Sequence, residues 1–481
     1  MLVLINTNTM RPPIAPIGLD YVAGSARQAG IQTDVLDLCL AQDPGAELES
    51  YFSRHEPTLV GITFRNSDDS FWPGGEWFVP KLAETVGAVR KLTEAPIVLG
   101  GVGFSIFPEA IVKHTGAEFG VHGDGEEAIV TLLRELEGQR RFERVGGLIW
   151  REDGGLRCNP PCWPNPILLE APRDAVDNFM YFRKGGQVGI ETKRGCNRRC
   201  IYCADPLAKG MSSRARLPSQ VADEMECLLL RGIDVLHLCD SEFNIPIEHA
   251  RAVCEEIIRR GLPKHVRWYA YLAAKPFDAA LASLMCRAGC VGINFTVDSA
   301  SEKMLATYRQ PHRQKDLRTI VEACRENGIS VMTDLLLGGP GETPETAAET
   351  IRFFKEVSPD CVGAALGVRI YPETAMARIV EMEGPLEKNP SIRRAYEGRV
   401  DLFRPTFYIS HALGERPAQL VRDLIAGDER FFEPRLDGDV ASDSSHNYNQ
   451  NARLLEAIAG GARGAYWDIL RRQKICKPHK A

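Results

Sequence analysis

Features that would assign this chain of 481 residues to a membrane, secreted or nucleic-acid-binding class are missing. It has no run of 18 uncharged apolar residues and no basic segment ahead of an apolar core at the N-terminus, so it offers neither a membrane span nor an export signal. A formal net charge of −6 gives no electrostatic case for nucleic-acid or membrane partners. We therefore expect a cytoplasmic protein without a membrane span and without a nucleic-acid partner.

Cysteine, by contrast, is plentiful, with 14 residues. In a chain without an export signal, thiols stay reduced and indicate a metal site rather than a disulfide framework. Cys196, Cys200 and Cys203 have C-x3-C-x2-C spacing, with Tyr202 just before the last. A zinc site is disfavoured, because no further Cys or His follows until Cys227. Three thiolates can hold a [4Fe–4S] cluster with one iron left open for a ligand; three unrelated buried thiols are the alternative.

Residues 1–140 alternate apolar strands with amphipathic helices, which is typical of a doubly wound, Rossmann-like parallel sheet. Ligands of such sheets lie at the carboxyl ends of the strands, where this chain places several glycines. Glycine lets the backbone approach a bulky ligand closely, although any one of them also suits a structural turn. The expected strands are Leu2–Asn6, Thr33–Leu38, Leu59–Phe64, Pro96–Gly101 and Phe119–His122.

A hairpin with an Asp-Gly turn and a proline-rich stretch form the expected linker, residues 141–186. The strand–helix alternation then resumes over residues 187–390, and six strands suit a partial (β/α)6 barrel with its chemistry at the C-terminal strand ends. The expected barrel strands are Val188–Thr192, Val235–Cys239, Val266–Tyr271, Val291–Val297, Ser330–Leu337 and Cys361–Ile370.

The remaining residues, 391–481, have no motif that assigns them, and we expect a small C-terminal domain. Its polar segment 437–450 is predicted to be a loop. Six of its aromatic residues are either core or a substrate cap over the barrel mouth. They are Phe403, Phe407, Tyr408, Tyr448, Tyr466 and Trp467.

The cysteine motif, with its aromatic residue before the last thiol, resembles that of the radical S-adenosylmethionine (SAM) superfamily. The resemblance implies that Cys196, Cys200 and Cys203 ligate the cluster and that Tyr202 lies beside bound SAM. The amino and carboxylate groups of SAM would then chelate the fourth iron. One-electron reduction would cleave SAM to methionine and a 5′-deoxyadenosyl radical.

Polar residues follow the second barrel strand, where superfamily members bind the SAM amino group. Asp240, Ser241 and Glu242 are the candidates, because a carboxylate makes a charge-assisted hydrogen bond to an ammonium group. A helix N-cap at Asp240 or Ser241 is the alternative. Arg214 and Arg216 resemble the family's basic stretch after the cluster loop, where they screen charge or lie exposed.

The later strand ends offer further SAM contacts by resemblance. Asp298 and Ser299 end the fourth strand, where relatives usually have Glu-Ser, and Arg369 ends the sixth. These would contact the ribose or carboxylate of SAM. Glu373 stands where the common form has glycine, so the backbone there is not expected to adopt a positive φ.

The first 140 residues resemble the N-terminal cobalamin-binding domain that precedes many radical SAM domains, through Pro16-Ile17-Gly18, Leu99-Gly100-Gly101 and Gly123-Asp124-Gly125-Glu126. The chain lacks D-x-H-x-x-G in its first strand–helix loop and so offers no histidine to cobalt. Arg65 is a candidate for the lower face of cobalamin; a solvated loop arginine is the alternative. The candidate cobalamin contacts are Gly18, Arg65, Gly100, Gly101, Gly103, Gly123, Gly125 and Glu126.

Together the resemblances imply a cobalamin-dependent radical SAM enzyme that C-methylates a small-molecule or lipid substrate. One SAM molecule would methylate cobalamin, and another would supply the radical. A flavodoxin- or ferredoxin-type protein would donate electrons. The alternatives are a non-methylating radical SAM enzyme that forms or contracts a ring or couples two carbons, and an iron–sulfur electron-transfer or sensor protein.

Overall fold

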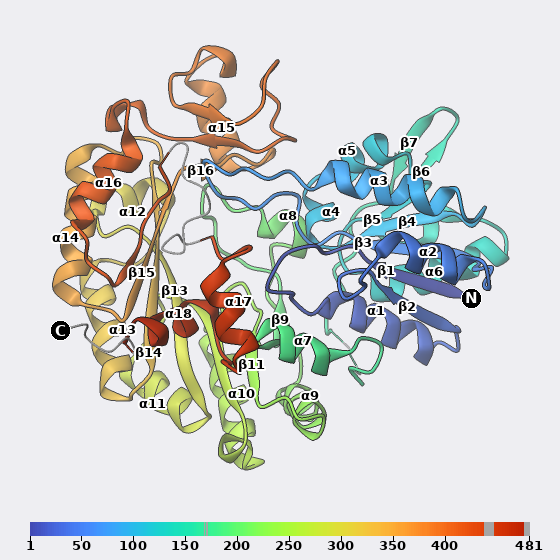
Figure 1. Ribbon diagram of the computed structural model, residues 1–481, viewed down its shortest axis with the longest axis horizontal. Coiled ribbons are helices and arrows are strands. Elements are labelled where there is room, and N and C mark those ends of the chain that lie inside the picture. Colours follow the sequence, from blue (N-terminus) through green and yellow to red (C-terminus); the bar gives the residue numbers. More distant parts are fainter. Residues whose placement is uncertain (168, 170–171, 437–446, 476–481) are drawn as a thin grey trace.

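The computed structural model describes residues 1–167, 169, 172–436 and 447–475. Two seven-stranded sheets form its two halves, one from the N-terminal third of the chain and one from the middle (Figure 1). No helix in these described ranges is long and apolar enough to cross a membrane. The predicted α/β class with two successive sheets is confirmed, whereas residues 437–446 of the predicted loop lie outside the described residues.

The N-terminal sheet has the strand order β2-β1-β3-β4-β5-β6-β7. Strands β1 to β5 are parallel, as predicted, and the central β1 is buried along its whole length. The predicted linker hairpin, β6–β7, instead extends this sheet, because β6 pairs antiparallel with β5. The strands are β1 (Leu2–Asn6), β2 (Thr33–Asp37), β3 (Leu59–Thr63), β4 (Ile97–Gly100), β5 (Phe119–Val121), β6 (Leu148–Glu152) and β7 (Gly155–Cys158).

Helices cover both faces of this sheet. On one face, α1 and α6 pack on Leu2 and Leu4, and on the other, α2, α3 and α5 pack on Val3 and Ile5. This alternation of buried side chains is what a strand buried on both faces requires. The helices are α1 (Ile17–Gln28), α2 (Pro44–Phe52), α3 (Val79–Arg90), α4 (Val102–Ile106), α5 (Pro108–Thr115) and α6 (Glu126–Glu137).

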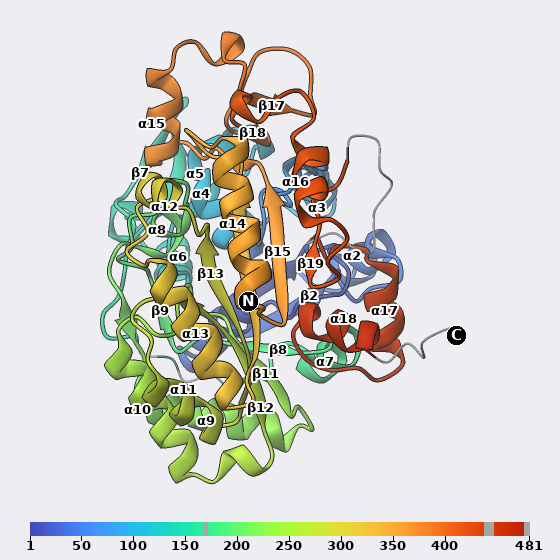
Figure 2. The ribbon, with the colours of Figure 1, turned by 90° about the vertical axis from the view of Figure 1, so that its left-hand side faces the viewer.

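The second sheet is the barrel, with the parallel order β8-β11-β12-β13-β14-β15-β19. Its helices lie on the outer side, as Figure 2 shows for α13 and α14. The strands are β8 (Val188–Ile190), β11 (Val235–Leu238), β12 (Arg267–Ala273), β13 (Cys290–Asp298), β14 (Ser330–Leu337), β15 (Cys361–Leu366) and β19 (Phe431–Phe432). The helices are α8 (Asp205–Lys209), α9 (Pro218–Leu230), α10 (Ile247–Arg259), α11 (Ala279–Arg287), α12 (Glu302–Tyr308), α13 (Gln314–Glu326) and α14 (Pro344–Val357).

The barrel departs from the prediction at its last strands. The expected strand Cys361–Ile370 breaks at Gly367, whose φ of +95° belongs to glycine's conformational range. After the break, β16 (Val368–Arg369) leaves the barrel and pairs with β18 (Thr406–Tyr408) in a small separate sheet. The short β19, from the C-terminal region, pairs with β15 as a seventh barrel strand that sequence patterning did not indicate.

The other elements lie between and around the two halves. Helix α7 and helix α17 are in contact, and α15 lies beside the small sheet at one end of the molecule (Figures 1 and 2). The elements are α7 (Asn178–Gly185), β9 (Lys193–Arg194), β10 (Arg214–Ala215), α15 (Ala375–Met382), β17 (Ile392–Arg394), α16 (Pro417–Ile425), α17 (Ala452–Ala459) and α18 (Tyr466–Ile475).

A buried network of charged and polar side chains joins the two halves. Glu224 of the barrel accepts hydrogen bonds from Arg173 and Arg216, both at 2.6 Å, and from Tyr21 of the N-terminal half at 2.9 Å. Arg173 also pairs with Asp20 at 2.8 Å. Because removing one member of a buried set of paired charges leaves the others uncompensated, this network fixes how the halves sit against each other.

Candidate active site

The cysteine loop follows β9 at the C-terminal end of the first barrel strand, as predicted. Gly195 enters it with a φ of +80°, and a Cβ there would lie 2.1 Å from the Ser212 carbonyl oxygen, so only glycine fits. Cys196 is buried, whereas Cys200 and Cys203 are half-buried. Burial, together with the nearby Asp298 and Glu242, raises the pKa of Cys200 to about 12. A bound metal would reverse this, because it takes up cysteine as thiolate.

A hydrogen-bonded chain holds the aromatic residue of this loop. The Tyr202 hydroxyl donates to both oxygens of Asp298, at 2.8 and 2.7 Å. Gln310 donates to Asp298 at 2.6 Å and lies 3.4 Å from the Cys200 sulfur. Burial raises the pKa of Asp298 to about 6, while these hydrogen bonds lower it. Asp298 therefore braces the cluster loop with both oxygens, and Gln310, which no sequence pattern indicated, shares that task.

The polar residues after β11 differ in how fully the protein already uses them. Asp240 accepts from the Thr192 backbone N–H at 2.8 Å and from its hydroxyl at 2.5 Å. Ser241 donates to Asp205 at 2.5 Å. Both side chains thus stabilise neighbouring loops.

Glu242 is the exception. Its Oε1 accepts from the Thr296 hydroxyl at 2.6 Å, while its Oε2 is shielded from solvent and has no hydrogen-bond partner among the described residues. Burial raises the pKa of Glu242 to about 7. A buried acceptor without a donor is costly. The ammonium group of SAM is a donor of the kind that would satisfy it, so Glu242 fits the predicted SAM site.

The remaining predicted SAM residues are held by the protein. Ser299 exchanges a 2.8 Å hydrogen bond with Thr350 in the core. Arg369 is buried, pairs with Asp68 of the N-terminal half at 3.1 Å and donates to the Leu402 carbonyl. Glu373 adopts a φ of +63°, so the expectation that its backbone avoids positive φ was wrong. The ion pair of Arg369 with Asp68 thus connects the two halves.

The two arginines after the cluster loop lie at the same interface. Arg214 pairs with Asp124 at 2.5 Å, and Arg216 belongs to the network around Glu224. Both are buried, so the alternative in which they lie exposed on the surface is wrong. Arg194 adds a 2.7 Å pair with Glu126, one of the predicted cobalamin contacts.

A cavity of about 230 Å³ lies at the carboxyl edge of the N-terminal sheet, between the strand ends, α1 and α6. Barrel residues Glu191, Arg194 and Lys209 close it from the opposite side. All but one of the predicted cobalamin contacts line it; Gly103 does not. The lining contacts are Gly18, Arg65, Gly100, Gly101, Gly123, Gly125 and Glu126.

The glycines among the predicted cobalamin contacts have two different uses. A Cβ added at Gly18 or Gly100 would meet nothing within 4 Å, so these positions leave open space for a ligand. A Cβ at Gly101 or Gly103 would come within 2.7 or 2.8 Å of the backbone at Phe64 or Asn66, so these glycines serve the protein's own packing. The open positions fit a large ligand such as the nucleotide tail of cobalamin.

Comparisons with known proteins agree with both halves. The B12 binding domain model matches residues 3–133, and the Radical SAM superfamily model matches residues 190–354. The tryptophan 2-C-methyltransferase of Streptomyces laurentii is 30% identical, over 96% of this chain and 94% of its own.

Two solved structures of TsrM, a radical SAM methyltransferase from Kitasatospora setae, are similar over nearly the whole chain. The structure with tryptophan and a SAM analogue has a TM-score of 0.90 at 32% identity and covers 98% of both chains. The structure with cobalamin and a [4Fe–4S] cluster has a TM-score of 0.89 at 30% identity and covers 98% of this chain and 97% of that one.

This chain belongs to the cobalamin-dependent radical SAM methyltransferase family. The predicted family, fold and class of enzyme are thereby confirmed, and the predicted cofactors, a [4Fe–4S] cluster, SAM and cobalamin, are those of the family.

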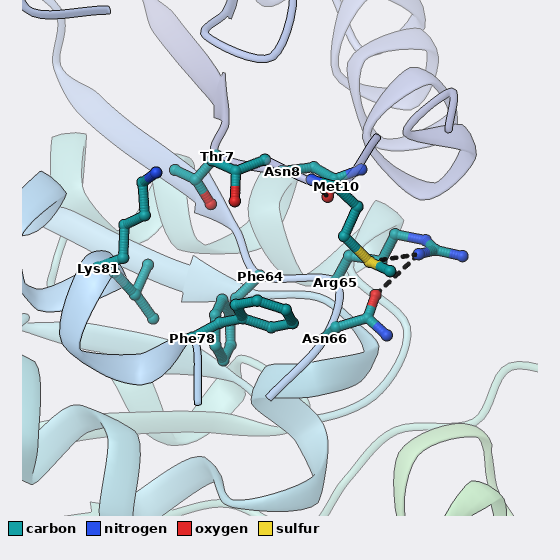
Figure 3. A pocket seen from close by; sticks show the side chains of 10 residues that line it. Thr7, Asn8, Met10, Phe64, Arg65, Asn66, Phe78 and Lys81 are labelled. Carbon is teal, nitrogen blue, oxygen red and sulfur yellow. Dashed lines mark hydrogen bonds between the residues drawn. The ribbon is translucent and has the colours of Figure 1, made fainter. Parts of the chain in front are cut away.

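A second hollow of this methyltransferase lies at the same sheet edge, beyond the ends of β1 and β3 (Figure 3). Arg65 donates to Asn66 at 2.8 Å and lies 3.9 Å from the Met10 sulfur. The Lys81 side chain extends toward Thr7 across the hollow, as Figure 3 shows. Lys81 was missed because it forms no motif in the sequence.

Aromatic and polar side chains of the methyltransferase gather inside the barrel, opposite Arg65. His237 and Tyr271 lie with ring centroids 5.0 Å apart, and burial lowers the pKa of His237 to about 4. Tyr448 and Tyr466, with centroids 5.9 Å apart, adjoin them from the C-terminal region. Burial raises the pKa of both tyrosines; Asp334 adds to the rise at Tyr448, Arg65 opposes it at Tyr466, and Tyr271 adds to the rise at both.

The other predicted cap aromatics are packed elsewhere. Phe403 contacts Trp77 and Phe107 of the N-terminal half, and Trp467 packs on Tyr269. Phe407 and Tyr408 are buried in β18. Only Tyr448 and Tyr466, of the six, adjoin the barrel interior.

Proposed function

We propose that this methyltransferase moves the methyl group of SAM to a carbon atom of a small aromatic molecule, with tryptophan as the first acceptor to test. Two findings support an aromatic acceptor. TsrM, which carries tryptophan in one solved structure, is 32% identical over nearly the whole chain. Aromatic rings at His237, Tyr271, Tyr448 and Tyr466 suit the planar faces of such an acceptor.

The observation that carries the proposal is the meeting of two candidate binding sites at one interface. Glu242 keeps a buried acceptor at the barrel edge, and Gly18 and Gly100 leave open space in a cavity that Arg194 and Lys209 of the barrel also line. A SAM molecule at the first site and cobalamin at the second therefore lie on either side of the same boundary. An acceptor at the barrel interior would lie near both.

The residues take separate tasks in this proposal. Cys196, Cys200 and Cys203 hold the cluster, and Glu242 orients SAM by binding its ammonium group. Asp298 keeps Tyr202 against the loop, which shields the cluster side from water. Bound cobalamin supplies methyl-group transfer, and the bound cluster supplies electrons and a binding position for SAM.

In this proposal, Arg65 would lie at the lower face of bound cobalamin. Among the described residues that line the cavity there is no histidine, and Arg65 stands at the sheet edge beside Met10. A guanidinium group does not ligate cobalt at neutral pH, because it stays protonated. Arg65 would therefore leave that face without a protein ligand. We also place the enzyme in the cytoplasm with a flavodoxin- or ferredoxin-type electron donor.

The test uses enzyme loaded with cluster and cobalamin, L-tryptophan, and SAM that carries a deuterated methyl group. We expect tryptophan that has gained the deuterated methyl on carbon, detected by mass spectrometry with fragmentation, and an equal amount of S-adenosylhomocysteine. Unchanged tryptophan would reject this acceptor and direct the search to other aromatic compounds. A converted acceptor without the label would instead indicate the non-methylating radical chemistry that the sequence left open.

A further inference from the structure

A separate cavity of about 420 Å³ lies outside the reaction site of the methyltransferase. The loops after β1 and β2 form one side of it, and the adjacent helices α7 and α17 form the other (Figure 1). None of its lining residues lines the cobalamin cavity. Its volume is in the range of pockets that hold small molecules.

The cavity concentrates positive charge without carboxylates to balance it. Arg183 and Lys184, in the last turn of α7, are exposed and make neither a hydrogen bond nor an ion pair within the described part of the chain. Within the described ranges, the Arg11 guanidinium donates only to neutral acceptors, the carbonyl oxygens of Met10 and Cys39, both at 3.0 Å, and the Cys39 sulfur at 3.4 Å.

The positive charge of the cavity also affects the pKa of a fourth cation, Arg463. Arg463 donates to the carbonyl oxygens of Ile458 and Ala462, and its pKa is lowered, first by burial and then by Arg183. The nearby Asp37 does not compensate, because its carboxylate accepts from Asn6 and Tyr181. Cations at a helix C-terminus stabilise the helix dipole, which accounts for Arg183 and Lys184 but not for Arg11 across the cavity.

The rest of the wall is apolar. Leu40 and Pro13 come from the N-terminal half, and Leu455 and Ile458 come from α17. A purely ionic ligand would leave this surface unused, whereas an apolar ligand would leave the cations unpaired. A ligand with an anionic group on an apolar body satisfies both.

We propose that this cavity binds a small amphipathic anion, a carboxylate or phosphate carried on an apolar body. The site is distinct from the place of methyl transfer. None of the barrel-interior aromatic residues His237, Tyr271, Tyr448 and Tyr466 is among the described residues that line this cavity. The occupant therefore contacts α7 and α17 and not the acceptor carbon.

The test is calorimetric titration of the cluster- and cobalamin-loaded enzyme with octanoate, octanol and inorganic phosphate, with no SAM or acceptor present. We expect octanoate to bind at least about tenfold more tightly than either of the others. The double variant R183Q/K184Q should weaken octanoate binding by about tenfold or more. Ala459→Trp, on the exposed rim, should do the same by filling the cavity without a change of charge.

The matched control is K264Q/R287Q, which removes two exposed cations elsewhere on the barrel half and should leave octanoate binding unchanged. If octanol bound as tightly as octanoate, the ligand would not need an anionic group. If phosphate bound as tightly as octanoate, it would not need an apolar body. Either result would contradict the proposed ligand. Failure of octanoate to bind, or binding that both cavity variants leave intact, would overturn the site. Because no turnover is measured, these outcomes are independent of the proposed methyl transfer.

Discussion

The two cofactor-facing edges of this enzyme are built in opposite ways. At the edge of the N-terminal sheet, space is made by missing side chains, since Gly18 and Gly100 face a cavity. At the barrel edge, the predicted SAM contacts are mostly occupied: Asp240 and Asp298 hold the protein's own loops, and of these contacts Glu242 alone has an oxygen without a hydrogen-bond partner among the described residues. In the proposed function, a large cofactor is thus admitted by the shape of the cavity, and a small charged one is recognised by a single acceptor.

The cluster ligands should show the largest effect. Cys200→Ala should reduce bound iron from about four atoms per chain to well below one and abolish reductive cleavage of SAM, because two thiolates do not retain the cubane. Iron and sulfide analysis after anaerobic reconstitution measures this. Cys227→Ala, which removes a thiol that donates to the Pro172 carbonyl, is the control and should keep its iron. A full complement of iron in Cys200→Ala would contradict the role of Cys200 as a cluster ligand at the barrel edge.

A larger side chain at the glycine-lined edge of the N-terminal sheet should reduce cobalamin binding. Gly100→Leu should reduce retention of hydroxocobalamin by about a hundredfold, because the new side chain occupies the cavity while the fold meets no clash there. Absorbance of the purified protein reports the bound cofactor, and iron content should stay unchanged. Gly87→Leu, whose Cβ is equally unobstructed on exposed α3, should retain cobalamin fully. Equal retention by both variants would show that the cavity does not hold the cofactor.

Removing the charge of Glu242 should have a smaller effect than removing a cluster ligand, but a measurable one. Glu242→Gln keeps the shape and removes the charge, so SAM affinity should fall by about tenfold with loss of a charge-assisted hydrogen bond. Equilibrium binding of SAM to cluster-loaded enzyme measures it. The exposed Glu248→Gln is the control and should bind SAM normally. Unaltered affinity in Glu242→Gln would move the SAM ammonium to another partner.

The same residue predicts a smaller effect of pH. Burial raises the pKa of Glu242 to about 7, so in the enzyme without SAM this group is protonated below that pH and ionised above it. The ammonium binds the ionised form, and SAM affinity should therefore rise about threefold to tenfold as pH increases from about 6 to about 7.5. The Glu242→Gln variant should lack this rise. Parallel profiles for the two proteins would exclude Glu242 as the titrating group.

Sequence patterns predicted what is local and missed what is distant. The cysteine spacing and the glycines at strand ends act through their own backbone, so their places in the fold followed from the sequence. The partner of Arg369 could not be predicted, because Asp68 is 301 residues away in the sequence. The partner of Asp298 could not be predicted either, because Gln310 follows a helix rather than a strand end. The break at Gly367 escaped for the same reason, since β16 leaves the barrel to pair with a strand nearly 40 residues later.

The central claim is that the methyl group of SAM reaches the acceptor only when both edges are filled. The most direct test compares enzyme loaded with cluster and cobalamin with enzyme loaded with cluster alone, each given methyl-deuterated SAM and acceptor. The account predicts labelled product with an equal amount of S-adenosylhomocysteine in the first, and neither in the second. Labelled product at the same rate without cobalamin would contradict it.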